Sequence, residues 1–326
     1  MALENAILEN PAAQRRFRRQ ILAWFDQNKR DLPWRKSCDP YRVWLSEVML
    51  QQTRVAAAVE HYRKFLLRFP TLAHLARARE SSVLAAWSGL GYYRRARMLH
   101  AAARKIVKER GGGFPDTAEQ LRTLPGIGRY TAAAIASIAF GEATAVVDGN
   151  VERVLQRIAG KNLSSEPLWQ VAAKLLDKTC PGDFNQAMME LGAILCLPRQ
   201  PRCLACPVNG LCATRGEHPR SEPPRHQRKR VIHCTLCVRD RRLLLVQRPC
   251  EATLMAGMWE LPEIISPNGA RPWLTLRHSI TTTDYSVKVF KGMAVEPNGH
   301  WIARSRIAQL PLTGLARKIL RAAEII

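Results

Sequence analysis

The sequence predicts a mainly α-helical region joined by a charged tether to a smaller α+β domain. Apolar residues recur at three- and four-residue spacing, as in helices that bury one face, at residues 43–50, 55–69, 131–140, 151–158 and 168–176. Pro and Gly pairs such as Pro125-Gly126 separate these segments. Later in the chain, strand-like patterns cover residues 231–238, 243–247 and 285–290, and an amphipathic segment at 315–325 predicts a closing helix.

A change of composition places the domain boundary. Residues 213–230 are basic and Pro-rich and lack large apolar side chains, which indicates an extended linker. We therefore expect a helical region at 1–212, a linker at 213–230 and a second domain at 231–326. A chain of 326 residues with 47% hydrophobic residues is long and apolar enough for two packed cores.

The chain carries a large excess of positive charge. It has 50 Lys and Arg against 27 Asp and Glu, so the formal charge is 50 − 27 = +23. This charge favours a polyanionic partner, with nucleic acid as the first candidate and a generically basic protein as the alternative. No stretch approaches the roughly 18 apolar residues of a membrane span, and the first twenty residues lack the order of a signal peptide. We therefore expect a cytosolic monomer that binds no membrane.

Four of the nine cysteines are closely spaced. Cys196, Cys203, Cys206 and Cys212 follow the pattern C-x6-C-x2-C-x5-C. Four thiolates in so short a segment suit structural Zn²⁺ or a [4Fe–4S] cluster. The lack of paired C-x2-C motifs at both ends favours iron–sulfur only weakly. A second C-x2-C at residues 234–237 lies in a predicted strand, where packing is the better interpretation.

Residues 121–129, Leu-Arg-Thr-Leu-Pro-Gly-Ile-Gly-Arg, predict a helix, a tight turn and a second helix. Gly126 and Gly128 allow unusual dihedral angles and a close approach of the backbone. The second helix is expected to begin near Arg129, where its unpaired N–H groups can hold a DNA phosphate without reading base sequence. An ordinary turn between helices is the alternative.

The hairpin followed by the cysteine pattern resembles the helix-hairpin-helix, iron–sulfur DNA glycosylases. Within that superfamily, LSEVMLQQT, GLGYYRRAR, VVDGNVERV and FNQAMMELG are similar to motifs of the MutY-type adenine DNA glycosylases, in the same order. The resemblance is dense over residues 15–212 and thin beyond. It implies a hairpin at about 121–140 and a [4Fe–4S] cluster on the loop at 196–212. It further implies excision of adenine opposite 8-oxoguanine or guanine in double-stranded DNA, as part of base excision repair.

The resemblance also assigns catalytic roles. Glu47 lies in an apolar helical segment, where burial raises the pKa of a carboxyl toward neutrality, as a general acid requires. The alternative is an exposed glutamate, or one paired with Arg42 or Arg54. The resemblance implies that Glu47 protonates adenine. Asp148 and Asn150 suit a helix N-cap, and the resemblance implies that Asp148 stabilises an oxocarbenium-like sugar with Asn150 as its polar companion.

Tyr130 separates the possible activities. Relatives of endonuclease III carry at this position a lysine that forms a Schiff base, which tyrosine cannot form. Tyr130 therefore predicts a monofunctional glycosylase, with a packing tyrosine as the alternative. It argues against a bifunctional endonuclease III-like glycosylase/lyase. Glu47 and Asp148 argue against the other rival, a non-catalytic iron–sulfur DNA-binding protein.

A flipped base leaves a gap in the duplex that protein side chains must fill. The resemblance implies that Gln52, at a predicted helix break with Thr53 as the next N-cap, and Tyr92, in a glycine-framed aromatic turn, are inserted into DNA. For both residues the alternative is an ordinary turn with polar surface side chains. Core packing or surface charge is the alternative for the pocket residues Trp34, Arg35 and Glu190. The candidate DNA- and base-contacting residues are Trp34, Arg35, Gln51, Gln52, Thr53, Leu90, Tyr92, Gly126, Gly128, Arg129, Glu190 and Ser279.

The C-terminal domain resembles the Nudix-like domain of the same family at residues 243–247 and 257–262. The paired glutamates of a catalytic Nudix box are absent after Arg230, which argues against pyrophosphate hydrolysis. The resemblance implies recognition of 8-oxoguanine. The family's Phe-Ser-His motif is replaced here, because Ile-Thr-Thr at residues 280–282 follows Arg-His-Ser at 277–279. We therefore expect hydroxyls of Ser279, Thr281 and Thr282 to contact the damaged base, with reduced discrimination.

Overall fold

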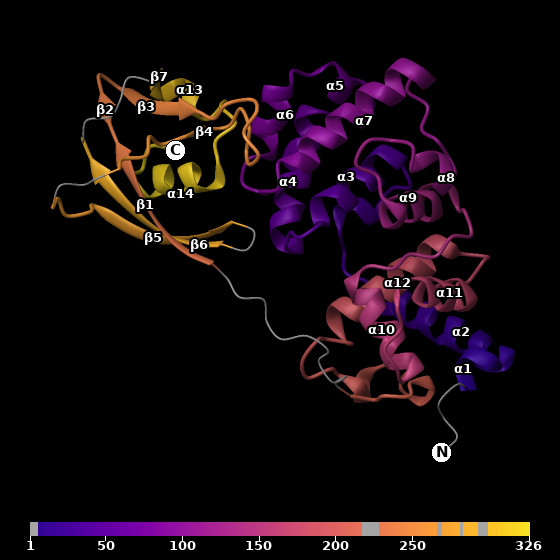
Figure 1. Cartoon of the computed structure of the whole chain (residues 1–326). Coiled ribbons are helices and arrows are strands. Elements are labelled where there is room, and N and C mark those ends of the chain that lie inside the picture. Colours follow the sequence, from indigo (N-terminus) through magenta and orange to yellow (C-terminus); the bar gives the residue numbers. More distant parts are fainter. Residues whose placement is uncertain (1–5, 217–227, 266–268, 281–282, 293–298) are drawn as a thin grey trace. The chain divides into compact units, whose positions relative to one another are not determined.

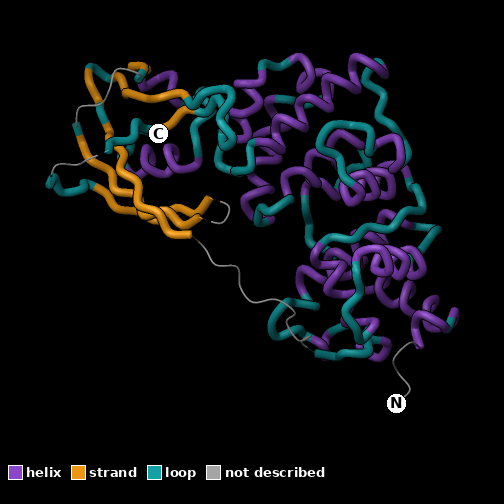
Figure 2. The backbone as a smooth tube through the Cα atoms, viewed as in Figure 1, coloured by secondary structure: helices purple, strands orange, loops and turns teal. Residues whose placement is uncertain are grey.

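Contacts divide the chain into two compact units, each formed from two separate stretches of sequence. The computed structural model describes residues 6–216, 228–265, 269–280, 283–292 and 299–326. Residues 1–62 and 102–221 form the first unit, and residues 63–101 and 222–326 form the second. Among the described residues, strands occur only after residue 227 (Figure 2). The predicted order, a helical region followed by a region with sheets, is confirmed.

All six segments predicted to be helical, residues 315–325 included, lie within a few residues of observed helices. Short 3-10 turns occur at Pro33–Arg35, Cys203–Ala205 and Asn209–Leu211. The α-helices up to residue 216 are α1 (Ala6–Glu9), α2 (Pro11–Asn28), α3 (Pro40–Leu50), α4 (Val55–Arg68), α5 (Leu72–Arg77), α6 (Glu80–Trp87), α7 (Arg94–Arg110), α8 (Ala118–Leu121), α9 (Arg129–Phe140), α10 (Gly149–Ala159), α11 (Ser165–Leu175) and α12 (Pro181–Ile194).

In the first unit, helices α2, α10, α11 and α12 enclose one hydrophobic core (Figure 1). Helix α10 buries Val151, Val154, Leu155 and Ile158, which recur at three- and four-residue spacing. Helix α9 packs against both α3 and α12. Its buried residues are mostly small, with four alanines at positions 132, 133, 134 and 136, which allows the neighbouring helices to approach closely. This packing places α3, α9, α10 and α12 around one site.

In the second unit, the C-terminal strands form two sheets. They are β1 (Arg228–Leu236), β2 (Val238–Arg239), β3 (Arg242–Gln247), β4 (Trp259–Glu260), β5 (Leu274–Ile280), β6 (Thr283–Lys291) and β7 (His300–Ala303), followed by helices α13 (Arg304–Ile307) and α14 (Gly314–Ala322). Strand β6 is central in one sheet, parallel to β1 and antiparallel to β5. Strand β3 pairs antiparallel with β2, β4 and β7. Both sheets and α14 contribute to one hydrophobic core.

The predicted linker is shorter than expected at its C-terminal end. Residues 228–230 belong to β1 and pair with residues 283–285 of β6, because their backbone completes the parallel ladder. Residues 217–227 of the predicted linker lie outside the described residues. The predicted strand at 231–238 is divided at Cys237, where β1 ends and β2 begins. No described helix is both long enough and apolar enough to cross a membrane.

Candidate functional site

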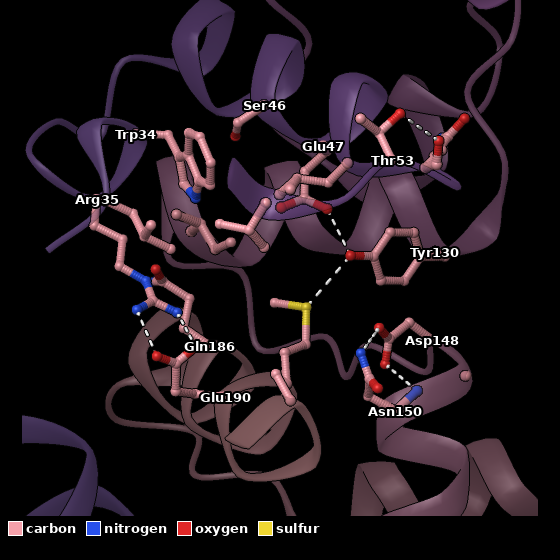
Figure 3. A pocket seen from close by; sticks show the side chains of 18 of the residues that line it. Trp34, Arg35, Ser46, Glu47, Thr53, Tyr130, Asp148, Asn150, Gln186 and Glu190 are labelled. Atoms are coloured by element: carbon pink, nitrogen blue, oxygen red, sulfur yellow. Dashed lines mark hydrogen bonds and ion pairs between the residues drawn. The ribbon is translucent and has the colours of Figure 1, made fainter. Parts of the chain in front are cut away.

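A cavity of about 800 Å³ opens in the first unit where α3, α9, α10 and α12 meet. Figure 3 shows Glu47 between Trp34 and Tyr130, with Asp148 and Asn150 beyond the tyrosine. Of the predicted site residues, the cavity lining includes Trp34, Arg35, Glu47, Gln51, Gln52, Thr53, Tyr130, Asp148, Asn150 and Glu190. The structure therefore brings together residues that are up to 156 positions apart in sequence (190 − 34).

Glu47 is buried at the cavity wall. Glu47 is only 5% exposed, and the Tyr130 hydroxyl donates a hydrogen bond of 2.5 Å to the Glu47 Oε2 atom. Burial raises the pKa of the Glu47 carboxyl to about 7. The Tyr130 hydrogen bond and the charge of Arg35 oppose this rise, whereas the charge of Asp148 adds to it. The predicted burial and raised pKa are confirmed, and the alternative of an exposed glutamate is wrong.

Asp148 is the N-cap of α10 and also faces the cavity. Its Oδ1 atom accepts hydrogen bonds from the backbone N–H groups of Asn150 and Val151, at 3.0 and 2.7 Å. The Asn150 side chain donates to the other carboxylate oxygen, Oδ2, at 3.1 Å. The capping interaction that the sequence suggested as an alternative is therefore present. It fixes the carboxylate at the rim of the cavity rather than excluding a chemical role.

A second carboxylate, Glu190 of α12, is held by two arginines. Glu190 is only 1% exposed. Arg30 donates to both carboxylate oxygens at 2.7 and 2.6 Å, and Arg35 donates to Oε2 at 2.9 Å. Burial alone would raise the pKa of Glu190, but the hydrogen bonds from Arg30 and Arg35 outweigh it and lower the pKa to about 2. Glu190 is therefore not a surface charge. Trp34, which is 8% exposed, lines the same cavity.

Helix α12 approaches the N-terminus of α10 closely at Gly192. A Cβ atom at Gly192 would lie 2.7 Å from the Asn150 Cβ atom and 3.0 Å from the Asn150 carbonyl oxygen. Real Cβ atoms essentially never come as close as 2.7 Å to another heavy atom. The glycine of the FNQAMMELG motif is therefore required for the position of Asn150.

We expect Gly192→Ala to lower the free energy of unfolding by about 1–3 kcal/mol, because the added methyl group overpacks the contact between two helices. Denaturant unfolding measures this change. Gly210→Ala is the matched control, because a Cβ atom there meets nothing within 4 Å. Equal stability of the two variants would show that Gly192 is not needed for the close contact.

Arg153 was not singled out from the sequence, yet it joins the cysteine loop to this site. Its Nε atom donates to the Cys196 carbonyl at 2.8 Å. Its Nη2 atom donates to the Asn150 Oδ1 atom at 2.9 Å and to the Gly192 carbonyl at 2.7 Å. The orientation of the Asn150 amide toward Asp148 is therefore set from the side of the cysteine loop. The sequence signal is weak, because Arg153 looks like an ordinary helix arginine.

The four closely spaced cysteines of the loop at 196–212 are neighbours in the structure. Burial, together with the charges of Cys196, Cys203 and Cys212, raises the pKa of the Cys206 thiol to about 11. Arg157, 3% exposed, donates to the Cys196 Sγ atom at 3.2 Å. All nine cysteines are free thiols. Among the described residues, no group of three or more His, Cys, Asp or Glu is arranged to hold a single metal ion.

The second helix of the predicted hairpin begins where the sequence predicted it. Helix α9 starts at Arg129, and Gly128 is its N-cap without any side-chain cap. Gly126 has a φ of 75°, but Gly128 has an extended backbone with a φ of −87°, so the expected unusual dihedral holds only for Gly126. The Arg129 side chain turns to α11, where it forms an ion pair with Glu166 at 2.8 Å and lies over the Trp169 ring.

Two exposed residues with left-handed backbone mark the predicted insertion segments. Gln52, in the break between α3 and α4, has a φ of 55°. Tyr92, in the turn between α6 and α7, has a φ of 46° and is 46% exposed. Non-glycine residues rarely adopt this conformation, and when they do the position is often functional. Leu90 of the same turn is instead 7% exposed and packs inward.

The residues beside Gln52 differ from the prediction. Thr53 is not the N-cap of α4, because the first helical bond of α4 runs from the Ala58 N–H to the Arg54 carbonyl. The Thr53 hydroxyl instead donates to the Gln51 carbonyl. The Gln51 amide donates to the Thr131 hydroxyl of α9 at 3.2 Å.

In the second unit, the Ser279 hydroxyl of β5 donates to the Asp284 carboxylate. Thr281 and Thr282 lie outside the described residues.

Comparison with known proteins places this geometry in a family. Residues 45–177 match the model of the HhH-GPD superfamily of base excision DNA repair proteins. The chain is 43% identical over 313 residues to the adenine DNA glycosylase of Homo sapiens, covering 76% of this chain and 57% of that protein. It is 40% identical over 316 residues to the adenine DNA glycosylase of Arabidopsis thaliana, covering 81% and 49%. The chain thus spans about half to three fifths of the length of these relatives.

Solved structures agree with this placement. The structure of a thermostable thymine-DNA glycosylase is similar, with a TM-score of 0.59 and 32% identity over 62% of this chain and 96% of that one. A non-covalent endonuclease III–DNA complex has a TM-score of 0.54 at 22% identity, which shows a shared fold over 62% of this chain and 94% of that one. The resemblance to the MutY-type glycosylases that the motifs predicted is confirmed by the curated relatives.

Proposed function

We propose that this chain, which belongs to the HhH-GPD superfamily of base excision DNA repair proteins, is an adenine DNA glycosylase. Its substrate is adenine opposite 8-oxoguanine or guanine in double-stranded DNA, and its reaction is hydrolysis of the N-glycosidic bond. The observation that carries this proposal is the buried Glu47 carboxyl, which faces a cavity with its pKa raised to about 7. Similarity to curated adenine DNA glycosylases supports the choice of base.

In the proposed reaction, Glu47 supplies the proton. A flipped adenine occupies the cavity, and the protonated Glu47 carboxyl donates to a ring nitrogen while the bond between the sugar C1′ and the base breaks. A water molecule adds its oxygen to C1′, and the proton that it loses restores Glu47. Tyr130 holds the carboxyl in place through its hydroxyl. The tyrosine offers no amine for a Schiff base, so the proposed enzyme is monofunctional.

Asp148 is assigned the electrostatic role. Positive charge develops on the sugar as the bond breaks, and a fixed carboxylate stabilises it without moving. Two backbone N–H groups and the Asn150 amide hold Asp148 in position. Glu190, already bound to two arginines, cannot serve as the acid, because its lowered pKa keeps it ionised. Together with Trp34 and Arg35, it forms the wall that receives the base.

Exposed and basic segments are assigned to DNA. The N-terminus of α9, with Gly126 and Gly128 before it, is the proposed phosphate site. The open space at Gly128 supports this role, because a backbone without a nearby side chain allows a phosphate to approach. Gln52 and Tyr92 are the proposed inserting residues. The sheets of the second unit form the proposed Nudix-like domain that recognises 8-oxoguanine, with Ser279 available once it leaves Asp284.

The cysteine loop is proposed to hold a [4Fe–4S] cluster through Cys196, Cys203, Cys206 and Cys212. Cys203, Cys206 and Cys212 lie in or directly after two 3-10 turns, and Cys196 follows the end of α12, so that four neighbouring thiols provide the all-thiolate donor set that such a cluster uses. Arg157 fits this role as a buried donor to one thiol sulfur. When bound, such a cluster contributes four iron–thiolate bonds that order the loop. Arg153 then transmits the position of that loop to Asn150.

We expect Cys203→Ser to lower iron content and DNA affinity together, because a loop that loses one ligand is no longer held beside α10 and α12. Iron analysis of the purified protein and binding to a mispaired duplex measure the two effects. Cys38→Ser is the matched control, because Cys38 is exposed and lies outside the loop. A fully active protein that contains stoichiometric zinc and no iron would refute the cluster.

The proposed function is tested with four duplexes, which carry adenine opposite 8-oxoguanine, adenine opposite guanine, thymine opposite guanine, and only matched pairs. We expect release of adenine from the first two, with strand breakage only after alkali. Breakage without alkali would favour a bifunctional glycosylase/lyase. Release of thymine would favour the activity named for the similar solved structure. Binding without release of any base would indicate a non-catalytic protein.

The raised pKa of Glu47 predicts the pH dependence of excision. The acid form is the active form, and the pKa is about 7, so its fraction falls tenfold for each pH unit above that value. We expect single-turnover excision to be fastest below pH 7 and to decline steadily from pH 7 to 9. Depurination of DNA alone is subtracted at each pH. A flat profile up to pH 9 would show that Glu47 does not donate the proton.

A further inference from the structure

The second unit contains two of the proposed DNA-reading segments. One is the turn between α6 and α7 that carries Tyr92, and the other is the end of β5, Arg277–Ile280. They are far apart in sequence. In the structure, both contact the same short stretch, the residues that enter and begin α14, Leu312–Lys318. We call this stretch the α14 entry.

The α14 entry holds both ends of the Tyr92 turn. The Ser88 hydroxyl, at the start of the turn, donates to the Leu312 carbonyl at 2.8 Å. The Tyr93 hydroxyl, at its end, donates to the same carbonyl at 3.0 Å. Arg317 donates from Nε to the Ser88 hydroxyl oxygen at 3.0 Å. Ser88, Tyr93 and Leu312 are each at most 5% exposed, so these bonds are shielded from water.

Within the turn, Tyr92 is further restrained by Arg95. The Arg95 guanidinium lies between two rings, 5.4 Å from the Trp87 centroid and 5.5 Å from the Tyr92 centroid. Its Nη2 atom donates to the carbonyls of Leu90 and Gly91. The exposed Tyr92 ring is therefore carried on a turn whose backbone is fixed at both ends and in the middle.

The same α14 entry holds the end of β5. Lys318 donates from Nζ to the Arg277 carbonyl at 2.8 Å. The His278 ring lies beside Gly314, where an added Cβ atom would be 3.7 Å from its Cε1 atom. The next residue of β5 is Ser279, the candidate contact to the base opposite adenine. One short segment thus contacts both the recognition strand and the inserting turn.

The α14 entry is itself rigid. The Trp259 N–H donates to the Pro311 carbonyl, and the Thr313 N–H donates to the Trp259 carbonyl, each at 2.9 Å. The Thr313 hydroxyl caps α14 by accepting from the Ala316 N–H. Leu312 is 0% exposed in the core of the C-terminal sheets. A displacement of Leu312 therefore moves the Tyr92 turn or breaks buried hydrogen bonds, and the Lys318 side chain of the same segment bonds the Arg277 carbonyl at the surface.

We propose that the α14 entry positions the Tyr92 turn relative to β5, so that recognition of the base opposite adenine and insertion of Tyr92 occur as one coupled step. This inference rests on the proposed function. Ser88, Tyr93 and Arg317 are positioning residues, which act through Tyr92 rather than by touching the substrate. Preference for 8-oxoguanine over guanine depends on this coupling as well as on contacts to the damaged base.

The experiment compares Ser88→Ala, Tyr93→Phe and Arg317→Met, each alone and combined with Tyr92→Ala. Ser88→Ala removes the donor to Leu312 and the acceptor of Arg317, Tyr93→Phe removes the second donor to Leu312, and Arg317→Met removes the donor to Ser88 together with its charge. Arg321→Met is the control, because Arg321 is exposed on the same helix and carries the same charge. The first readout is the ratio of single-turnover excision rates for 8-oxoguanine and guanine duplexes at saturating enzyme. The second is the fluorescence of 2-aminopurine placed next to 8-oxoguanine, which reports unstacking when the protein binds. Thermal unfolding is recorded for every variant.

We expect each positioning variant to lower the preference ratio by about threefold to tenfold, the scale of one buried hydrogen bond, and to lower the 2-aminopurine signal. We also expect no further loss when the variant is combined with Tyr92→Ala, because both changes act on the same step. Variants that unfold earlier but keep the wild-type ratio and fluorescence would overturn the inference. The inference would also be overturned if a positioning variant combined with Tyr92→Ala lost more of the preference ratio than Tyr92→Ala alone.

The fluorescence measurement needs no excision, which separates the two proposals. If the wild-type protein releases no adenine, the proposed function fails. The coupling is then supported if Ser88→Ala and Tyr93→Phe lower the 2-aminopurine signal on binding, and it is refuted if they leave the signal unchanged. If the wild-type protein excises adenine and these variants match it in ratio and signal, only the coupling fails.

Discussion

Replacing Glu47 by Gln is expected to lower the single-turnover rate of adenine excision by roughly 10²–10⁴-fold, the usual contribution of a general acid. The glutamine amide has nearly the same shape as the carboxyl, so the cavity stays intact, but it has no acidic proton to give to the base. Binding to a duplex with adenine opposite 8-oxoguanine is expected to stay near the wild-type level. Rapid quenching of a single turnover measures the rate, and fluorescence anisotropy of labelled DNA measures binding.

Tyr130→Phe is the companion variant for this test. It removes the hydroxyl that donates to Glu47 but leaves the ring and the carboxyl. That hydrogen bond lowers the pKa of Glu47, so its loss is expected to move the pH profile toward higher pH with a smaller loss of rate. Near-normal excision by Glu47→Gln would remove Glu47 from the mechanism. A profile that stays in place in Tyr130→Phe would show that the tyrosine does not act through the carboxyl.

Local patterns in the sequence were enough to predict most of the fold. Apolar spacing placed α3, α4, α9, α10 and α11 within a few residues, because each helix buries one face of its own sequence. The burial of Glu47 was predicted for the same reason, since it lies on an apolar helix. The N-cap at Asp148 followed from residue type and position alone.

Features that depend on distant partners could not be predicted in this way. Arg30 and Arg153 were not singled out from the sequence, and only the packing of α12 against the rest of the unit brings Glu190 to Arg30 and the Gly192 carbonyl to Arg153. The N-cap of α4 was placed one residue too early, at Thr53, because the left-handed backbone at Gln52 delays the start of the helix. The linker was predicted too long because residues 228–230 pair with a strand more than fifty residues later.

Arg153 supports the second large prediction. Its guanidinium donates to the Cys196 carbonyl in the cysteine loop, the Gly192 carbonyl at the end of α12 and the Asn150 side chain. Asn150 in turn donates to Asp148. A neutral Arg153→Met fills similar volume but leaves these acceptors without their shared donor. The Asn150 amide is then held only through its own bond to Asp148, and the carboxylate proposed to stabilise the sugar is restrained less firmly.

We expect Arg153→Met to lower single-turnover excision about 100-fold at saturating enzyme, because a misplacement of about 1 Å in a catalytic group has an effect of that size. Arg199→Met, which removes the same charge from an exposed position in the cysteine loop, is expected to keep the wild-type rate at saturation. Asn150→Ala should lower the rate as well, and the double variant should be no slower than the worse single variant, since both changes release the same carboxylate. If the rate losses of Arg153→Met and Asn150→Ala multiply in the double variant, Arg153 does not act through Asn150. A rate for Arg153→Met equal to that of Arg199→Met would show that the cysteine loop does not set the geometry at Asp148.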